Sequence, residues 1–213
     1  MNSKGKSRHA SNPTWIRRHL SDPYVKQAQA QGYRSRAAFK LLEIVAQDRL
    51  LGPGMLVVDL GAAPGSWAQV AAGKVGSAGR VVAVDLLGIE PLAGVDIVQG
   101  DLRDDGVFDR TAQLLGGRKA DLVLSDMAPN LSGIAVSDQA RSRDLCELAL
   151  EFARLALKPG GNFLVKTFQG AGYKEFLEAM RRDFTTVASR KPGASRDSSA
   201  EMYLLGKGFR VGT

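Results

Sequence analysis

The segment best suited to chemistry is a glycine-bounded turn between an apolar run and a helix start. Residues 59–67 read Asp-Leu-Gly-Ala-Ala-Pro-Gly-Ser-Trp and overlap the end of the apolar run Met55–Leu60. Such a run is typical of a strand buried on both faces of a parallel sheet. Gly61 and Gly65 let the backbone turn sharply and approach a ligand, and Pro64 suits the first position of the next helix. The segment therefore predicts a site for a nucleotide-like cofactor.

The spacing of these glycines bears on the kind of cofactor. It differs from the G-x-G-x-x-G pattern of dinucleotide enzymes, so an anionic pyrophosphate is not the expected ligand. A small zwitterion, such as the methionine part of S-adenosylmethionine (SAM), would fit the turn. A glycine-rich turn that binds nothing is the alternative for this segment taken alone.

Acidic residues end or follow three other predicted strands, at Asp85, Asp101 and Asp126. Ligands of an open parallel sheet bind beyond the carboxyl ends of its strands, so these carboxylates are expected at the same site. Asp85 lies at the distance from the glycine turn expected of a carboxylate that accepts hydrogen bonds from a ribose diol. Asp101 is placed to meet an adenine amino group. The alternative for each carboxylate is a cap on the following helix.

A lysine within an apolar strand is the second chemical signal. Lys166 lies in the run Asn162–Phe168, and a buried lysine must find an acid or lose its charge. Asp126, at the end of the strand expected beside it, is a natural partner. Lys40 and Glu201 are further candidates, although either residue taken singly is typical of a surface charge.

These side chains must be positioned by a sheet that brings strand ends together. Five apolar runs predict strands, at Met55–Leu60, Arg80–Leu86, Val95–Val98, Asp121–Ser125 and Asn162–Phe168. Apolar spacings of three and four predict helices at 66–75, 104–115, 139–157 and 173–182. This alternation is typical of an α/β protein with a doubly wound parallel sheet.

Two more apolar runs close the chain, at Phe184–Ala188 and Met202–Leu205. The segment between them is scarcely long enough for a parallel crossover, so the two strands are expected to pair antiparallel. The predicted fold is the Rossmann-like architecture of SAM-dependent methyltransferases, with a mostly parallel seven-stranded sheet and a C-terminal antiparallel hairpin.

Composition limits the class of protein. At 213 residues with 44% apolar content, the chain can bury one substantial core. Its single cysteine, Cys146, excludes an intrachain disulfide and indicates a reducing compartment, with core packing as its expected role. No apolar run approaches the ~20 residues needed to cross a bilayer, so we expect a soluble, cytoplasmic protein without membrane contact.

The net charge of +7 resides in the N-terminal segment. Residues 1–36 hold one acid, Asp22, and eight basic residues, namely Lys4, Lys6, Arg8, Arg17, Arg18, Lys26, Arg34 and Arg36. The rest of the chain is balanced, which indicates an arm that contacts phosphates. We expect a basic arm over residues 1–34, partly disordered, before a catalytic domain over residues 35–213. A solvated tail and an organelle transit peptide are the alternatives.

Several motifs in order resemble the FtsJ-like RNA 2′-O-methyltransferases, from about Trp15 to Leu205. They are Tyr24-Val25, Gly32–Ala37, Phe39–Leu41, Asp59–Gly65, Ser125–Asn130 and Val165-Lys166. The resemblance implies a Lys-Asp-Lys-Glu catalytic tetrad formed by Lys40, Asp126, Lys166 and Glu201. It implies SAM contacts from Gly61, Ala63, Pro64, Gly65, Trp67, Asp85, Asp101, Leu102 and Asp126, without a metal. It also argues against a transit peptide.

The resemblance implies transfer of a methyl group from SAM to a ribose 2′-hydroxyl in 23S rRNA, on a uridine of the aminoacyl-site loop. The partner would be large-subunit rRNA within the 50S particle, and the enzyme a monomer. Methylation of another RNA such as tRNA, and a non-catalytic ribosome-assembly factor, remain alternatives. A nicotinamide-dependent oxidoreductase fits neither the glycine spacing nor the arm.

The hairpin loop of this sequence departs from the family pattern. Close relatives tend to have an arginine-rich hairpin loop, whereas here Ser195-Arg196 is followed by Asp197-Ser198-Ser199-Ala200. An RNA contact by this loop is therefore not expected from its composition. Because the expected cofactor contacts all lie beyond residue 34, the arm is not expected to affect cofactor binding.

Overall fold

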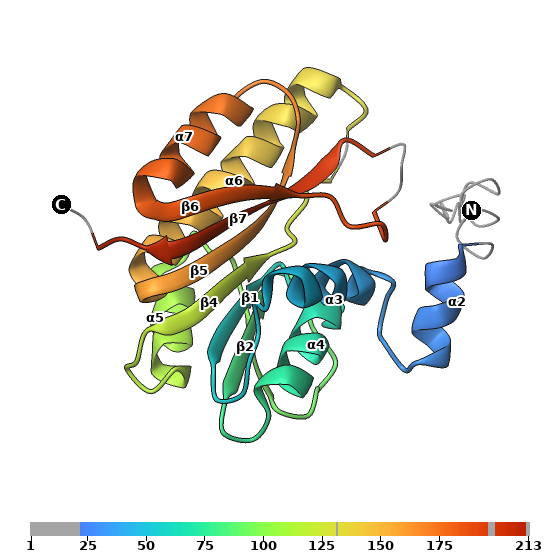
Figure 1. The fold of residues 1–213 in the computed structure, drawn as a ribbon, viewed down its shortest axis with the longest axis vertical. Helices are drawn as coiled ribbons and strands as arrows, with labels where there is room; N and C mark the ends of the chain where they lie inside the picture. Colours follow the sequence, from blue (N-terminus) through green and yellow to red (C-terminus); the bar gives the residue numbers. More distant parts are fainter. Residues whose placement is uncertain (1–21, 131, 196–198, 212–213) are drawn as a thin grey trace, which may run out of the picture.

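The computed structural model describes residues 22–130, 132–195 and 199–211, and it shows one seven-stranded sheet covered by helices on both faces (Figure 1). The strand order is β3-β2-β1-β4-β5-β7-β6. The strands are β1 (Leu56–Leu60), β2 (Arg80–Asp85), β3 (Val95–Gln99), β4 (Ala120–Ser125), β5 (Leu157–Phe168), β6 (Phe184–Arg190) and β7 (Glu201–Phe209).

The pairing directions confirm the predicted fold. Strands β1 to β5 pair in parallel, while β7 pairs antiparallel with both β5 and β6. The central strand β1 is buried along its whole length, as its continuous apolar sequence predicts. The carboxyl ends of β1, β2, β4 and β5 consequently meet at one edge of the sheet, where a Rossmann-like protein binds its ligands.

Helices cover the sheet in two layers (Figure 1). Apolar residues of α3 (Ala37–Asp48) and α4 (Ser66–Val75) pack on one face, and those of α5 (Asp105–Leu114), α6 (Ala135–Ala156) and α7 (Tyr173–Asp183) pack on the other. Each helix presents its apolar residues to the sheet because burial of that surface stabilises the fold. Within the described ranges, no helix is both long and apolar enough to cross a membrane.

Several element boundaries differ from the prediction. Pro64 does not occupy the first position of a helix, because α4 begins at Ser66 and Gly65 is its N-cap with φ 104°. β5 begins at Leu157, whereas the predicted strand begins at Asn162 and the predicted helix runs to residue 157. β7 continues to Phe209, beyond the predicted end at Leu205, because it pairs along its length with β6 as well as β5.

The predicted arm divides into two parts. Residues 22–34 contain α2 (Pro23–Ala30), which packs against α3 through the rings of Tyr24 and Phe39, 5.6 Å apart. Asp22 caps α2 and forms an ion pair with Arg36. Residues 1–21 of the predicted arm lie outside the described residues.

Candidate active site

A cavity of about 440 Å³ opens where the carboxyl ends of β1, β2 and β4 meet. Its volume lies within the range of small-molecule sites, roughly 300–1,000 Å³. Six of the residues expected to bind the cofactor line it, namely Gly61, Ala63, Asp85, Asp101, Leu102 and Asp126. Sequence reasoning missed its apolar walls, which include Leu86, Leu87, Met127, Ala128, Leu145 and Leu148. Met127 and Ala128 lie in the motif Ser125–Asn130, directly after Asp126, and that position is a signal that could have indicated a role. The four leucines belong to no motif identified in the sequence.

Glycine is required at two points of the turn after β1. Gly61 adopts φ 71°, and a Cβ atom there would collide with the side chain of Met127 and lie 3.1 Å from its Cα. Gly65 adopts φ 104°, and its Cβ would lie 2.8 Å from the guanidinium of Arg34. Both conformations belong to the left-handed region that favours glycine. The turn is therefore closely packed against Met127, which follows β4, and against Arg34 in the N-terminal segment.

The two carboxylates expected at the nucleoside are held by main-chain N–H groups. Asp85 accepts hydrogen bonds from the N–H groups of Ala63 and Leu87, both at 2.8 Å, and Asp101 accepts one from Arg103 at 3.0 Å. Neither residue caps a helix, since the cap of α5 is Asp104. The alternative of helix capping is therefore wrong for Asp85 and Asp101, and both carboxylates lie on the cavity wall.

The four residues of the expected tetrad form two ion pairs at this edge of the sheet. The Nζ atom of Lys166 lies 3.1 Å from Oδ1 of Asp126, and Nζ of Lys40 lies 2.6 Å from Oε1 of Glu201. Lys166 comes from β5, Asp126 follows β4, Lys40 lies on α3, and Glu201 begins β7. The Lys166 side chain is only 7% exposed, so its carboxylate partner compensates the cost of burying its charge.

A tyrosine joins the two ion pairs. Tyr203 is fully buried and its hydroxyl lies 2.9 Å from Oδ1 of Asp126 and 3.4 Å from Oε1 of Glu201. Its ring lies 5.9 Å from Nζ of Lys40. Tyr203 pairs with Lys166 across β5 and β7, which explains why one tyrosine can reach both acids. The sequence placed Tyr203 beside Glu201 but gave no sign of this bridging contact.

The charges in this cluster are mutually compensating. Burial opposes ionisation of Glu201, but Lys40, Lys166 and the hydroxyl of Ser195 outweigh it and lower the pKa of the carboxyl. Burial and the two neighbouring carboxylates raise the pKa of Tyr203, which keeps its phenol protonated and able to donate. Glu201 is therefore a carboxylate at neutral pH, and Tyr203 is a hydrogen-bond donor.

Asp59 lies fully buried beneath this edge of the sheet. Burial raises the pKa of its carboxyl well above the usual value, and the nearby carboxylates of Asp126 and Asp85 add to the rise. The shift favours the neutral form of Asp59. A neutral side chain there avoids a third negative charge next to the two carboxylates on the cavity wall.

The other three expected cofactor contacts, Pro64, Gly65 and Trp67, lie outside the described lining of the cavity. Trp67 is 2% exposed, its Nε1 donates a hydrogen bond to the carbonyl oxygen of Ala37 at 2.9 Å, and its ring lies 5.5 Å from that of Tyr203. In this geometry Trp67 joins α4 to α3 and supports the tetrad instead of facing the cavity.

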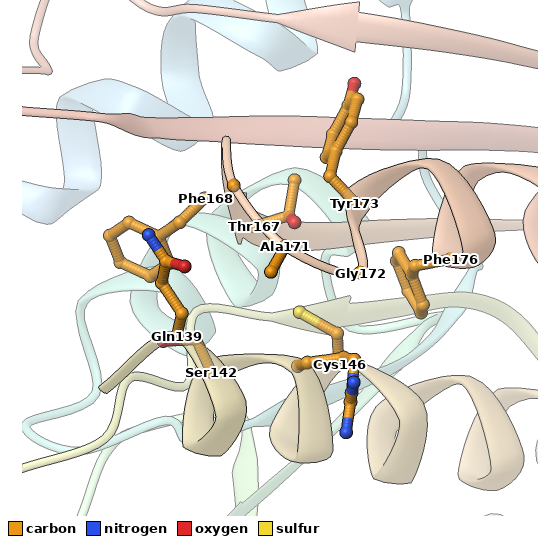
Figure 2. Close-up of a pocket in the computed structure, with 11 residues that line it drawn as sticks. Gln139, Ser142, Cys146, Thr167, Phe168, Ala171, Gly172, Tyr173 and Phe176 are labelled. Carbon is orange, nitrogen blue, oxygen red and sulfur yellow. The ribbon is translucent and has the colours of Figure 1, made fainter. Parts of the chain in front are cut away.

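A second, small cavity lies behind the end of β5 (Figure 2). Its volume of about 20 Å³ offers room for roughly one water molecule and none for a cofactor. Figure 2 shows Cys146 on α6 facing the loop that carries Ala171 and Gly172. The thiol of Cys146 donates to the carbonyl oxygen of Lys166 at 3.2 Å, and burial raises its pKa to about 11. Cys146 packs in the core, and its protonated thiol is a poor nucleophile at neutral pH.

No group of three or more His, Cys, Asp or Glu side chains suited to a metal ion occurs among the residues that the structure describes.

The family model of the FtsJ-like methyltransferases matches residues 33–209. Two curated relatives named ribosomal RNA large subunit methyltransferase E align with nearly the whole chain. The protein of Azoarcus sp. is 59% identical over 203 residues, which cover 95% of this chain and 99% of that protein. The protein of Chromobacterium violaceum is 57% identical over 204 residues, which cover 96% of this chain and 100% of that protein.

Two solved structures share the fold of this chain. A crystal structure named for a ribosomal RNA methyltransferase of Plasmodium falciparum gives a TM-score of 0.75 at 28% identity, covering 85% of this chain and 100% of that one. Fibrillarin of Aeropyrum pernix in complex with SAM gives 0.55 at 18% identity, covering 82% and 75%. The second likeness concerns the fold alone.

Proposed function

Because the chain belongs to the FtsJ-like methyltransferase family, we propose that it transfers a methyl group from SAM to a ribose 2′-hydroxyl in large-subunit rRNA. The nucleotide would be a uridine of 23S rRNA, reached in the 50S particle by a monomeric, cytoplasmic enzyme. The observation that carries the proposal is the position of Asp126, which lines the cavity and is also paired with Lys166. One residue thus joins a cofactor-sized cavity to the buried lysine.

The residues around the cavity fit SAM by their chemistry. Asp85 and Asp101 offer carboxylate oxygens for a ribose diol and an adenine amino group, and the turn after β1 reaches the cavity wall at Gly61 and Ala63. The apolar walls suit the faces of an adenine ring. When bound, SAM would supply an electrophilic methyl group on a sulfonium. In this assignment Trp67, Pro64 and Gly65 shape the turn from outside the cavity.

The tetrad would act on the nucleophile. A ribose hydroxyl is a poor nucleophile, so the enzyme must orient its oxygen and remove its proton during methyl transfer. Correct orientation alone can lower a barrier by ~7–11 kcal/mol. Lys166, held by Asp126, is the group that would orient the hydroxyl. Lys40 and Glu201, already paired and linked through Tyr203, would fix the ribose from the other side.

Two versions of proton removal remain distinct. In the first, an uncharged Lys166 accepts the proton. In the second, charged Lys166 only directs the oxygen lone pair, and water takes the proton. The ion pair with Asp126 at 3.1 Å positions Nζ in both versions, and the Lys166→Arg variant distinguishes them.

The test is transfer of a tritiated methyl group from SAM to large ribosomal subunits that lack the modification, combined with calorimetric titration of SAM and NAD. We expect SAM binding and label on a 2′-hydroxyl of 23S rRNA. Label on tRNA alone would change the substrate, and RNA binding without any transfer would indicate an assembly factor. NAD binding without SAM binding would overturn the proposal.

A further inference from the structure

Arg34, the last residue of the predicted basic arm, binds three main-chain carbonyl groups. Its Nη1 atom donates to the carbonyl oxygens of Pro64 and Glu90, both at 2.8 Å, and its Nη2 atom donates to that of Pro91 at 2.7 Å. Pro64 belongs to the glycine turn after β1, whereas Glu90 and Pro91 belong to the connection between β2 and β3. One guanidinium therefore joins two loops that are separate in the sequence.

The same guanidinium determines the packing of the turn. Its Nη1 atom occupies the space where a side chain at Gly65 would begin, 2.8 Å from the position of that Cβ. On the other side of the turn, the N–H group of Ala63 is bound by Asp85. The turn is thus held from the cavity side by Asp85 and from the outer side by Arg34.

The backbone around Arg34 is fastened to α4. Gln69 accepts a hydrogen bond from the N–H group of Arg34 at 3.1 Å and donates one to the carbonyl oxygen of Gly32 at 2.8 Å. The hydroxyl groups of Ser35 and Ser66 lie 2.7 Å apart. These contacts fix the main chain of Arg34 beside α4, so its position near the turn does not depend on the guanidinium bonds alone.

We propose that Arg34 is a positioning residue of the cofactor site, which holds the glycine turn and the β2–β3 connection in the geometry that binds SAM. The inference rests on the proposed use of this cavity by SAM. The position of Arg34 in a basic arm suggests that it binds phosphate. Its Nη atoms instead donate to three carbonyl groups within the protein. The β2–β3 connection begins with Leu86 and Leu87 on the cavity wall. Loss of the hydrogen bonds from Arg34 to this connection would therefore loosen that wall.

The sharpest test is Arg34→Lys in the full chain, since lysine keeps the positive charge but lacks the planar fork that reaches three acceptors. We expect the Kd and the KM for SAM to rise about tenfold, while kcat at saturating SAM stays within threefold of wild type. The salt dependence of RNA binding should not change, because the number of positive charges is the same. Arg154→Lys is the matched control, since Arg154 also binds within the protein, to Asp183 on the opposite face of the sheet, and should leave SAM affinity unchanged.

Arg34→Met separates the two roles of the residue. If Arg34 positions the cofactor site, this variant should lose SAM affinity at least as strongly as Arg34→Lys and keep the RNA salt slope. Two results together would overturn the proposal and make Arg34 a phosphate contact. They are a SAM affinity within twofold of wild type in both variants, and a slope of log RNA affinity against log salt that is lower by about 0.9 in Arg34→Met. A fall of both variants' melting temperature by about 10 °C or more, with kcat lost at saturating SAM, would instead assign Arg34 to general stability and also overturn it. Wild-type protein that fails to bind SAM would refute the proposed cofactor, which is a separate result.

Discussion

Lys166 is bound twice by Asp126, at 2.6 Å through the main-chain carbonyl oxygen and at 3.1 Å through Oδ1 of the side chain. Both acceptors belong to the residue that follows β4, the strand that pairs with β5 beside Lys166. The ammonium group is therefore oriented by the backbone as well as by the carboxylate. This arrangement makes the position of Nζ insensitive to small movements of the Asp126 side chain.

Replacing Lys166 should separate chemistry from cofactor binding. We expect Lys166→Ala to lower kcat of methyl transfer by about 10²-fold or more, the range of positioned acid–base groups, with SAM affinity within twofold of wild type. Single-turnover transfer and calorimetry measure the two quantities. Lys158→Ala is the control, because Lys158 lies on the same strand with a half-exposed side chain and should leave transfer unchanged.

The variant Lys166→Arg distinguishes the two versions of the mechanism. Guanidinium keeps the charge but does not accept a proton near neutral pH. If Lys166 is the base, the arginine variant should be nearly as impaired as the alanine variant. Activity within tenfold of wild type would exclude the base and favour an orienting charge.

Asp85 should matter for cofactor affinity. In Asp85→Asn one of the two acceptor oxygens is replaced by an amide NH2 group, which cannot accept, so one of the bonds from Ala63 and Leu87 is lost. The charge-assisted bonds that we propose between this carboxylate and the ribose would be lost as well. Such bonds contribute ~1.5–3 kcal/mol, so we expect SAM affinity to fall by roughly 10- to 100-fold in calorimetry. Asp109→Asn, at an exposed position on α5, is the control. An unchanged Kd for Asp85→Asn would remove this carboxylate from the site.

Two truncations should have different effects. Deleting residues 1–21 removes five basic residues and keeps Asp22, α2 and Arg34, so SAM affinity should persist. If about three of those charges contact phosphates, the slope of log affinity for RNA against log salt should fall by roughly 2.7, at about 0.9 per contact. Deleting residues 1–34 removes Arg34 as well and should also weaken SAM binding. Equal salt slopes for full-length and shortened proteins would contradict an RNA-binding arm.

Asp48 should contribute to stability without affecting the site. Its side chain is 5% exposed and binds Arg190 through both oxygens at 2.7 Å and Lys207 at 3.0 Å, which joins the end of α3 to β6 and β7. We expect Asp48→Asn to lower the free energy of unfolding by about 3 kcal/mol in urea, because both cations lose their carboxylate. The exposed Asp144 is paired with Arg143 at 3.8 Å, and Asp144→Asn should cost less than about 0.5 kcal/mol.

The ion pair of Asp48 with Arg190 predicts that the free energy of unfolding depends on pH. The hydrogen bonds from Arg190 outweigh burial and lower the pKa of Asp48 below its ordinary 3.8. A lowered pKa stabilises the fold at every pH above the unfolded value, and the contribution is lost as pH falls through the folded value. Wild-type stability should therefore fall below about pH 4 more steeply than that of Asp48→Asn. Parallel pH profiles would show that the ion pair adds nothing to folding.

Much of the architecture follows from local sequence patterns. The apolar run before Gly61, the helical spacings between strands and the short final connection predict a parallel sheet that ends in an antiparallel hairpin, and this is confirmed. These features depend on residues close together in the chain, which burial and hydrogen bonding act on directly. The Lys166–Asp126 pair was also predictable, because a lysine inside an apolar strand requires an acid from a neighbouring one.

The remaining contacts were decided by the tertiary structure. Lys40 and Glu201 lie 161 positions apart, and nothing in their local sequence distinguishes them from surface charges. Their pairing depends on how α3 packs against β7, and the bridge through Tyr203 depends on the register of β7 against β5. Arg34 looked like part of an RNA-binding arm, yet the fold turns its guanidinium toward carbonyl groups of two distant loops. A charged side chain binds whichever complementary group the packing of the chain brings within reach. Local sequence patterns therefore predict the sheet and the edge that carries the candidate site, whereas the partner of each charged side chain depends on the fold.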